Sequence, residues 1–232
     1  MKEPTLLPVS FPSILVNSNV GIAVGMASSI CPFNLAEVCE TAAALIRDPA
    51  HPVESTLKGP DFPIGGQILY DPVELRKVYE TGRGAIRVRS RYRYDKDANC
   101  IEITEIPPTT TVEAIIDKVV ELVKGGRARE IADVRDETDL SGLKLTIDCK
   151  RGTDPDALMK KLFKLTPLED SFSCNFNVLV GLTPKVMGIR EILEEWTAFR
   201  LECVRRRIHF ELKRKQDKLH LLKGLEKILL DI

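Results

Sequence analysis

The chain has 232 residues, of which 44% are hydrophobic and 29% are charged, a balance typical of one large or two small soluble domains. Its 34 basic and 34 acidic side chains cancel, so the overall charge does not favour a nucleic-acid or membrane partner, and any basic surface has to be local. The most apolar window, residues 11–30, is interrupted by an Asn-Ser-Asn turn and two glycines. It is therefore not the unbroken run of about 20 apolar residues that a membrane-spanning helix requires.

Cysteine and histidine usage indicates neither a metal site nor a disulfide framework. The six cysteines are scattered without a C-x-x-C pair, and the three histidines add no zinc-ligand spacing. Prolines at positions 4, 8 and 12 interrupt the start of the chain, where a signal peptide would need an unbroken apolar core. We therefore expect reduced thiols, no bound metal and a cytoplasmic location.

The first predicted elements lie between residues 13 and 30. "SILVN" and "GIAVGMA" are typical of two short strands joined by the turn Asn17-Ser18-Asn19, which predicts a hairpin near residues 14–27. The apolar patch Ile22-Ala23-Val24 lies between two glycines. From the residues alone, an isoleucine in this setting is more often part of a core. The polar residues before it either only build the turn or present hydrogen-bond donors to a ligand.

A helix and a connector follow. In "CPFNLAEVCETAAALIRD", Asn34 is placed to cap a helix, Glu37 follows three residues later, and apolar residues recur at helical spacing. Residues 48–66 are rich in proline and glycine, which predicts a connector without regular structure.

The segment "AIRVRSRYRYD" is predicted to form one strand of a second hairpin. Alternation with period two places four arginines on one face of that strand: Arg87, Arg89, Arg91 and Arg93. Such a row would neutralise phosphates and make DNA binding dependent on salt. The alternative is that Glu102 and Glu105, on the returning strand "CIEITEIP", pair with these arginines across the hairpin.

Helices and strands then follow one another without strict alternation. The sequence predicts helices in "TVEAIIDKVVELVKGG" and "DPDALMKKLFKLT", the second capped by Asp154, and strands in "KLTIDCK" and "FNVLVGL". This order favours an α+β fold, with a mixed sheet-and-helix domain rather than repeated βαβ units.

From about Ile189 to the end, no proline interrupts a helical pattern, and Gly224 is its one weak position. At about 1.5 Å per residue this helix would span about 65 Å, which one small domain cannot bury. Four leucines form an apolar seam that predicts a partner helix, as in a coiled coil: Leu219, Leu222, Leu225 and Leu229. The pattern reaches Ile232 without a cap, so we interpret it as a truncated helix.

Several motifs together resemble the A subunit of bacterial type IIA DNA topoisomerases, the family of the DNA gyrase and topoisomerase IV A subunits. "EPTLLPVSFPSILVNSNVGIAVGMASSICPFNLAEV" is similar to the family pattern P-x-x-L-V-N-G-x-x-G-I-A-V-G-M-A-T-x-I-P-P-H-N-L. "GPDFP", "YETGRG", "EIP", "RDETD" and "EEWTAFRLECVRRR" follow in the family's order, so the resemblance covers essentially the whole chain. Ser18, Cys31 and Phe33 depart from the pattern, where the family has Gly, Pro and His.

The resemblance implies two parts. Residues 1–187 would be a DNA-bending tower domain, and residues 188–232 the first, truncated helix of a coiled-coil arm. The family's nucleophilic tyrosine lies upstream on a winged-helix module, and Tyr92 and Tyr94 do not match its motif, so no catalytic residue is expected in this chain. "RDETD", residues 135–139, would be a structural feature of the tower and not a metal site.

The resemblance also assigns a site and partners. The family's isoleucine in G-I-A-V-G-M inserts between base pairs of the DNA that is cut, which implies this role for Ile22 and phosphate contacts for Asn17, Ser18 and Asn19. Expected partners are double-stranded DNA, a second copy of the A subunit, and a B subunit that holds Mg²⁺ and ATP. The chain would support double-strand breakage, passage and reunion in an A2B2 enzyme and be inactive alone.

Two other classes of function are alternatives to this one. A helical scaffold or dimerisation module would use the leucine seam without binding DNA. An independent enzyme has little support, because the sequence contains no P-loop, no dinucleotide-binding turn and no recognisable Ser/His/Asp or Cys/His set.

Overall fold

The computed structural model describes residues 6–230. Its helices are α1 (Ser13–Val16), α2 (Leu35–Arg47), the 3₁₀ turn η1 (Val53–Ser55), α3 (Pro72–Thr81), α4 (Val112–Lys124), α5 (Pro155–Leu165) and α6 (Ile189–Leu230). Its strands are β1 (Asn19–Ala23), β2 (Met26–Ile30), β3 (Gln67–Ile68), β4 (Arg83–Arg89), β5 (Arg91–Asp95), β6 (Cys100–Glu105), β7 (Ile131–Asp136), β8 (Leu145–Cys149), β9 (Glu169–Asn175), β10 (Asn177–Val180) and β11 (Thr183–Val186). The α+β class expected from the sequence is confirmed.

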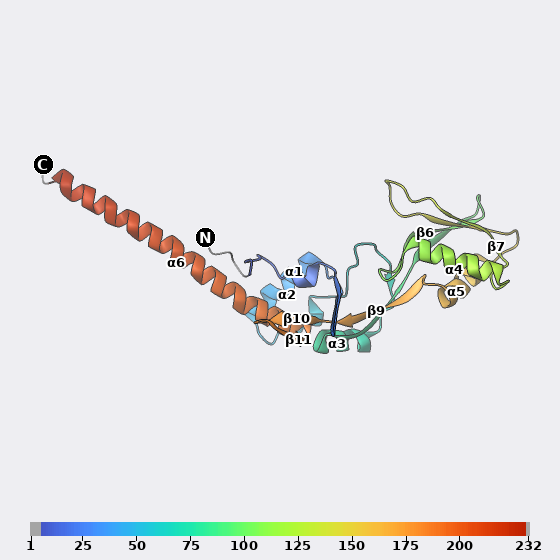
Figure 1. The fold of residues 1–232 in the computed structure, drawn as a ribbon, viewed down its shortest axis with the longest axis horizontal. Helices are drawn as coiled ribbons and strands as arrows, with labels where there is room; N and C mark the ends of the chain where they lie inside the picture. The colour runs from blue at the N-terminus through green and yellow to red at the C-terminus, as the bar shows by residue number, and fades with distance from the viewer. Residues whose placement is uncertain (1–5, 231–232) are drawn as a thin grey trace.

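The molecule is elongated (Figure 1). A central body contains α1, α2 and α3, an outer lobe contains α4 and α5, and α6 projects from the side of the body opposite the outer lobe. Strands β4 and β9 run from the body toward the outer lobe and connect the two. The positions of the body, the outer lobe and α6 relative to one another therefore depend on these two strands and on the first turns of α6.

All strand pairs are antiparallel. The body holds a five-stranded sheet in the order β1-β2-β9-β4-β3, and the outer lobe holds a four-stranded sheet in the order β5-β6-β8-β7, while β10 and β11 form a separate hairpin. The longest ladder joins β4 to β9, from Arg83 opposite Asn175 to Arg89 opposite Glu169. The β1–β2 hairpin joins this sheet where Ser29 lies opposite Asn175.

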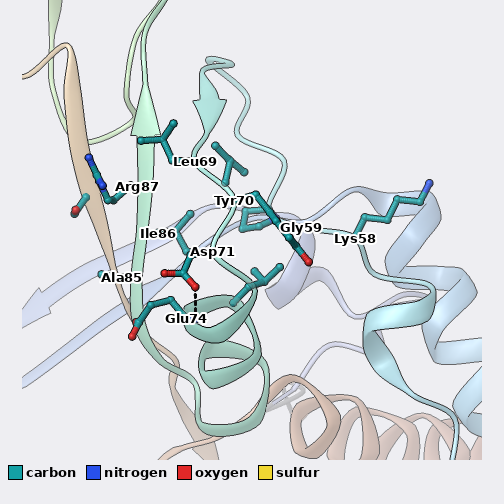
Figure 2. Close-up of a pocket in the computed structure, with 13 residues that line it drawn as sticks. Lys58, Gly59, Leu69, Tyr70, Asp71, Glu74, Ala85, Ile86 and Arg87 are labelled. Atoms are coloured by element: carbon teal, nitrogen blue, oxygen red, sulfur yellow. Dashed lines mark hydrogen bonds between the residues drawn. The ribbon is translucent and has the colours of Figure 1, made fainter. Parts of the chain in front are cut away.

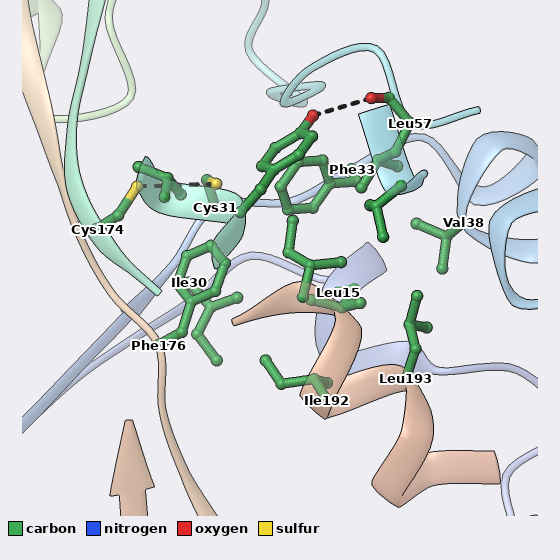
Figure 3. Packing of buried hydrophobic residues seen from close by; sticks show 14 of the residues in the cluster. Leu15, Ile30, Cys31, Phe33, Val38, Leu57, Cys174, Phe176, Ile192 and Leu193 are labelled. Carbon is green, nitrogen blue, oxygen red and sulfur yellow. Dashed lines mark hydrogen bonds between the residues drawn. The ribbon is translucent and has the colours of Figure 1, made fainter. Parts of the chain in front are cut away.

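Body and outer lobe have separate hydrophobic cores. In the body, Leu15, Ile30, Phe33, Phe176 and Leu193 are buried between α1, α2, α6 and the five-stranded sheet (Figure 3). In the outer lobe, the buried side chains of α4 and α5 pack against those of β6 and β8. Because the two clusters share no residue, each part buries apolar surface of its own.

The predicted helices and their caps are confirmed. The Asn34 side chain accepts a hydrogen bond from the Ala36 N–H at 3.0 Å, and Asp154 accepts one from the Asp156 N–H at 3.0 Å. Each cap satisfies a backbone donor that the first helical turn leaves free. The sequence did not predict α3, β3, β7, β9 or β11.

The segment "SILV" is helical and not the strand that its branched residues predicted. It forms α1, in which the Asn17 N–H donates to the Ser13 carbonyl at 2.9 Å. The helical turn directs Leu15 into the core, where it is fully buried. Burial of this side chain outweighs the weak strand preference of four residues.

The first hairpin consequently turns at a different place. Its strands pair from Asn19 opposite Ile30 to Ala23 opposite Met26, so the turn lies at Val24-Gly25 and not at residues 17–19. Gly25 has a φ of +79°, a conformation that glycine adopts without steric cost. The predicted strand "GIAVGMA" is thus a strand, a turn and the start of the next strand.

The predicted arginine strand is two strands in different sheets. β4 ends at Arg89 and β5 begins at Arg91. Ser90, between them, is fully buried, and its N–H donates to the Leu168 carbonyl at 2.8 Å. The chain therefore passes from the body into the outer lobe at Ser90, while the predicted hairpin of β5 with β6 is confirmed.

Two glycines allow α6 to start against the end of α3. Gly82 has a φ of +68°, and a Cβ atom there would lie 2.2 Å from the Met187 carbonyl oxygen. A Cβ atom on Gly188 would lie 2.3 Å from the Glu80 carbonyl oxygen. Neither position can hold a larger residue without displacing backbone. Farther along, every α6 side chain from residue 205 to 230 is exposed.

We predict opposite effects of alanine at two glycines. Gly82→Ala should lower the free energy of unfolding by about 2–4 kcal/mol, because the left-handed φ and the backbone contact both oppose a Cβ atom. Gly224 lies in the exposed part of α6, and a Cβ atom there would have no atom within 4 Å. Gly224→Ala should therefore stabilise the helix by about 1 kcal/mol. Urea denaturation followed by circular dichroism measures both. An unchanged midpoint for Gly82→Ala would contradict the close contact.

Candidate nucleic-acid interface

The tip of the β1–β2 hairpin carries apolar side chains that the rest of residues 6–230 leaves uncovered. Ile22 is 91% exposed, and Val20, Val24 and Met26 are exposed as well. A core residue would be buried by neighbouring elements, so the alternative that Ile22 belongs to the core is excluded. The hairpin holds an apolar residue in solvent at the end of a tight turn.

Register places Ile22 on the outward face of the five-stranded sheet. Residues directly opposite each other in an antiparallel sheet point to the same face. The register gives one row across four strands, formed by Val20, Ser29, Asn175 and Arg83. Ile22 is two residues from Val20 along β1 and therefore shares its face.

The two faces of this sheet differ sharply in chemistry. The inner face of β4 and β9 presents Ile86, Val88 and Phe172, all buried in the body core. The outer face of these two strands presents small, polar or charged side chains and ends at the pair of Arg89 with Glu169. We call the following residues the open sheet face: Val20, Ile22, Ser29, Arg83, Ala85, Arg87, Ser171, Ser173 and Asn175.

Hydrogen bonds between side chain and backbone fix the root of the hairpin. The Ser28 Oγ donates to the Asn177 carbonyl at 2.9 Å, and the Asn175 Nδ2 donates to the Ala27 carbonyl at 2.8 Å. Both bonds connect β2 to the segment where β9 becomes β10. The hairpin thus has a held base and an exposed tip.

The four predicted arginines are divided between the two lobes, and all are paired. Arg87 and Arg89 both bind Glu169, with 2.6 Å between Arg89 Nη2 and Glu169 Oε2. Burial alone would raise the pKa of Glu169, but hydrogen bonds from Arg89 and Arg87 hold it below its usual range. A doubly paired carboxylate therefore lies at the end of the open sheet face nearest the outer lobe.

In the outer lobe, the alternative of pairing across the hairpin is confirmed. Arg91 binds Glu105 at 3.2 Å, and Arg93 binds Glu102. Glu102 also binds Lys144 at 3.1 Å, and hydrogen bonds from Arg93 and Lys144 lower its pKa. The guanidinium groups remain largely exposed, so these pairs do not prevent contact with a phosphate.

The polar residues before the hairpin lie beside it in solvent. Asn17 ends α1, Ser18 follows it, and Asn19 begins β1; all three are exposed. Asn19 lies three residues before Ile22 on β1, so the alternation of side chains puts it on the opposite face of the sheet. Its partner on that face is the buried Ile30. The three residues thus precede or begin the β1–β2 hairpin in the chain, and the structure leaves them unburied.

A cavity of about 350 Å³ lies beside β3 and the start of α3, and Ala85, Arg87 and Ser171 of the open sheet face contribute to its lining (Figure 2). Its acidic residues are already engaged, since Asp71 caps α3 and Glu74 binds Lys77 at 3.3 Å. Lys58 points away from the other labelled side chains. The side chains lining the cavity include no histidine or cysteine.

Membrane spans and metal clusters are both missing from residues 6–230. No helix there is long and apolar enough to cross a membrane. No group of three or more His, Cys, Asp and Glu side chains is arranged there to hold a metal ion. All six cysteines are free thiols.

Comparison with known proteins identifies the family. The family model described as the A subunit of DNA gyrase/topoisomerase IV matches residues 1–232. The chain belongs to this family. It is 38% identical over 231 residues to the DNA gyrase A subunit of Borreliella burgdorferi, covering 97% of this chain and 28% of that protein. It is 39% identical over 236 residues to the DNA gyrase A subunit of Synechocystis, covering 97% and 27%.

The family also includes organellar relatives. The chain is 37% identical over 232 residues to a chloroplastic/mitochondrial DNA gyrase A subunit of Nicotiana benthamiana, covering 97% of this chain and 25% of that protein. The chain thus spans about a quarter of the length of the gyrase A subunits that it matches.

Most residues of the open sheet face were not predicted from the sequence, and among those residues Arg83 is the one that carries a charge. Arg83 belongs to the family motif "YETGRG", but its place outside the Arg87–Arg93 alternation gave no reason to select it. Only the β4–β9 and β2–β9 registers bring it into the row that contains Val20. The available signal was the glycine on each side, which marks a position of close packing.

Glu169→Gln tests the double ion pair. The variant should be about 1 kcal/mol less stable than wild type at neutral pH, because two arginines lose a largely buried shared acceptor. The folded-state pKa of Glu169 is lowered, so its stabilisation is present above the ordinary pKa of 4.5 and disappears as the pH falls through the folded value. Urea denaturation in a pH series should show the two stability curves converging in acid. Curves that stay equally separated would contradict the pairing.

Proposed function

We propose that this chain binds and bends double-stranded DNA as part of the A subunit of a type II DNA topoisomerase. The observation that carries the proposal is Ile22, 91% exposed at the tip of a hairpin whose base is held by hydrogen bonds. An apolar wedge between base pairs accounts for this exposure. Membership of the gyrase and topoisomerase IV A-subunit family supports the same conclusion.

A comparison of the cost of unstacking with the gain from burying Ile22 indicates that this side chain alone cannot hold DNA bent. Unstacking one base step costs a few kcal/mol, and burying one isoleucine side chain returns about 1.5–3 kcal/mol. These two contributions nearly cancel. A bent duplex therefore needs phosphate contacts on either side of the wedge, which the exposed hydroxyls of Ser171 and Ser173 and the polar segment Asn17, Ser18 and Asn19 can supply.

The four paired arginines can take part by exchanging partners. The Arg91–Glu105 pair is partly exposed and contributes little to stability, so replacing its carboxylate by a phosphate costs little. Glu102 would keep Lys144 as a partner if Arg93 turned to a phosphate. Arg87 and Arg89 lie in the body sheet and Arg91 and Arg93 in the outer lobe. A duplex that contacts all four has to run along both lobes, which a bend at the hairpin would favour.

In the intact enzyme, we place the chain beside a winged-helix module that carries the nucleophilic tyrosine. Two A and two B subunits would break one duplex, pass a second through it and rejoin the ends, with ATP and Mg²⁺ held by the B subunits. The chain alone should be inactive.

The exposed leucines of α6 support the coiled-coil arm. Leu219, Leu222, Leu225 and Leu229 are all more than half exposed, and α6 packs on the body only near its start. A second helix would cover this seam. The same observation supports the alternative function, a helical scaffold that associates through α6 without binding DNA.

Energy transfer between the labelled ends of a duplex of about 30 base pairs tests bending. Wild type should bring the ends closer, and Ile22→Ala should abolish most of that change while retaining part of the affinity, because the phosphate contacts remain. Leu140→Ala is the matched control, since Leu140 is at least as exposed as Ile22 but lies in the loop between β7 and β8.

Two outcomes would overturn the proposal. Equal bending by wild type and Ile22→Ala would show that Ile22 is not the wedge. Concentration-dependent association of the chain in sedimentation, with no DNA binding even at low salt, would favour the scaffold.

A further inference from the structure

Arg83 differs from the other arginines of β4 and β5. It is exposed, yet no carboxylate within residues 6–230 lies within ion-pair distance of it. Arg87, Arg89, Arg91 and Arg93 each bind a glutamate. Arg83 therefore presents a full positive charge on the open sheet face, where a new anion would not have to compete with a glutamate.

The backbone on both sides of Arg83 is confined by close packing. A Cβ atom on Gly84 would lie 2.6 Å from the Val78 Cγ2. Gly82, on the other side, cannot hold a Cβ atom without displacing the Met187 carbonyl. Only Arg83 in this tripeptide has a side chain, and the helix α3 and the start of α6 fix the backbone that carries it. The guanidinium thus extends from a rigid base.

The register fixes the spacing between Arg83 and the wedge. Three steps between neighbouring strands, each about 4.8 Å, separate Arg83 on β4 from Val20 on β1, and two residues along β1 add about 7 Å. The Cα atoms of Arg83 and Ile22 are therefore about 16 Å apart. Base pairs rise about 3.4 Å along a duplex, so this distance corresponds to about four or five base pairs.

We propose that Arg83 anchors a backbone phosphate about four or five base pairs from the step that Ile22 opens. This inference rests on the proposed function, because it requires DNA on the open sheet face. Arginine suits the role, since its planar fork can donate two hydrogen bonds to one phosphate. Ser29, which lies between the two sites in the same cross-strand row, offers a neutral donor to the intervening backbone. Wedge and anchor together would hold the duplex at two points of one rigid sheet.

The salt dependence of DNA binding tests the anchor. Binding of the 232-residue chain to the same duplex is measured at several salt concentrations for wild type, Arg83→Gln and Arg83→Lys. Loss of one phosphate contact should reduce the slope of log affinity against log salt by about 0.9 and weaken binding at low salt by about tenfold. Arg83→Lys should restore the slope, which depends on charge, but only part of the affinity, which depends on the fork.

Matched variants separate anchoring from other effects. Arg151→Gln removes the same charge from an exposed turn of the outer lobe and should leave the slope unchanged. At saturating protein, Arg83→Gln should still bend the duplex, whereas Ile22→Ala should keep the wild-type slope and lose the bend. Thermal unfolding of each variant confirms that it is folded.

The outcomes distinguish this inference from the proposed function. If wild type binds and bends DNA but Arg83→Gln has the wild-type slope, the anchor is wrong and the function stands. An equal loss of slope in Arg151→Gln would also overturn the anchor, because the effect would then be one of overall charge. If wild type binds no DNA at low salt, the proposed function fails and this inference fails with it.

Discussion

The antiparallel pairing of β4 with β9 is the constraint on which the other features depend. Its alternation separates a buried face, with Ile86, Val88 and Phe172, from an open face of serines and arginines. At one end of the ladder Asn175 receives the β1–β2 hairpin, and at the other the chain passes through Ser90 into the outer lobe. A single ladder therefore fixes both the direction of the β1–β2 hairpin and the connection between the lobes.

Polar and cation–π contacts gather where the two lobes are connected. Arg89 binds Glu169 and also lies 4.6 Å from the centre of the Phe163 ring, on α5 of the outer lobe. Glu105 of the outer lobe accepts a hydrogen bond from the Gly66 N–H of the body at 2.7 Å. Since each lobe has its own core, such polar and cation–π contacts set the angle between them.

Prediction from sequence succeeded where the signal is local. The caps at Asn34 and Asp154 and the long helix α6 follow from residues that interact within one or two helical turns. It failed where burial decides: "SILV" became helical because Leu15 reaches the core, and the arginine strand broke because Ser90 is buried at the junction of two sheets. Neither residue differs visibly from its neighbours in the sequence.

The sequence by itself determined the family and the fold class, because these follow from motifs and from local patterns of apolar residues. Only the tertiary structure decided which arginine of β4 and β5 has no carboxylate partner within residues 6–230 and which residues share a face with Ile22. The reason is that ion pairing and strand register join residues far apart in the chain: Glu169 reaches Arg87 and Arg89, and Asn175 brings Arg83 into one row with Val20. No local pattern encodes those partners, since they exist only once β4, β9 and β2 have paired.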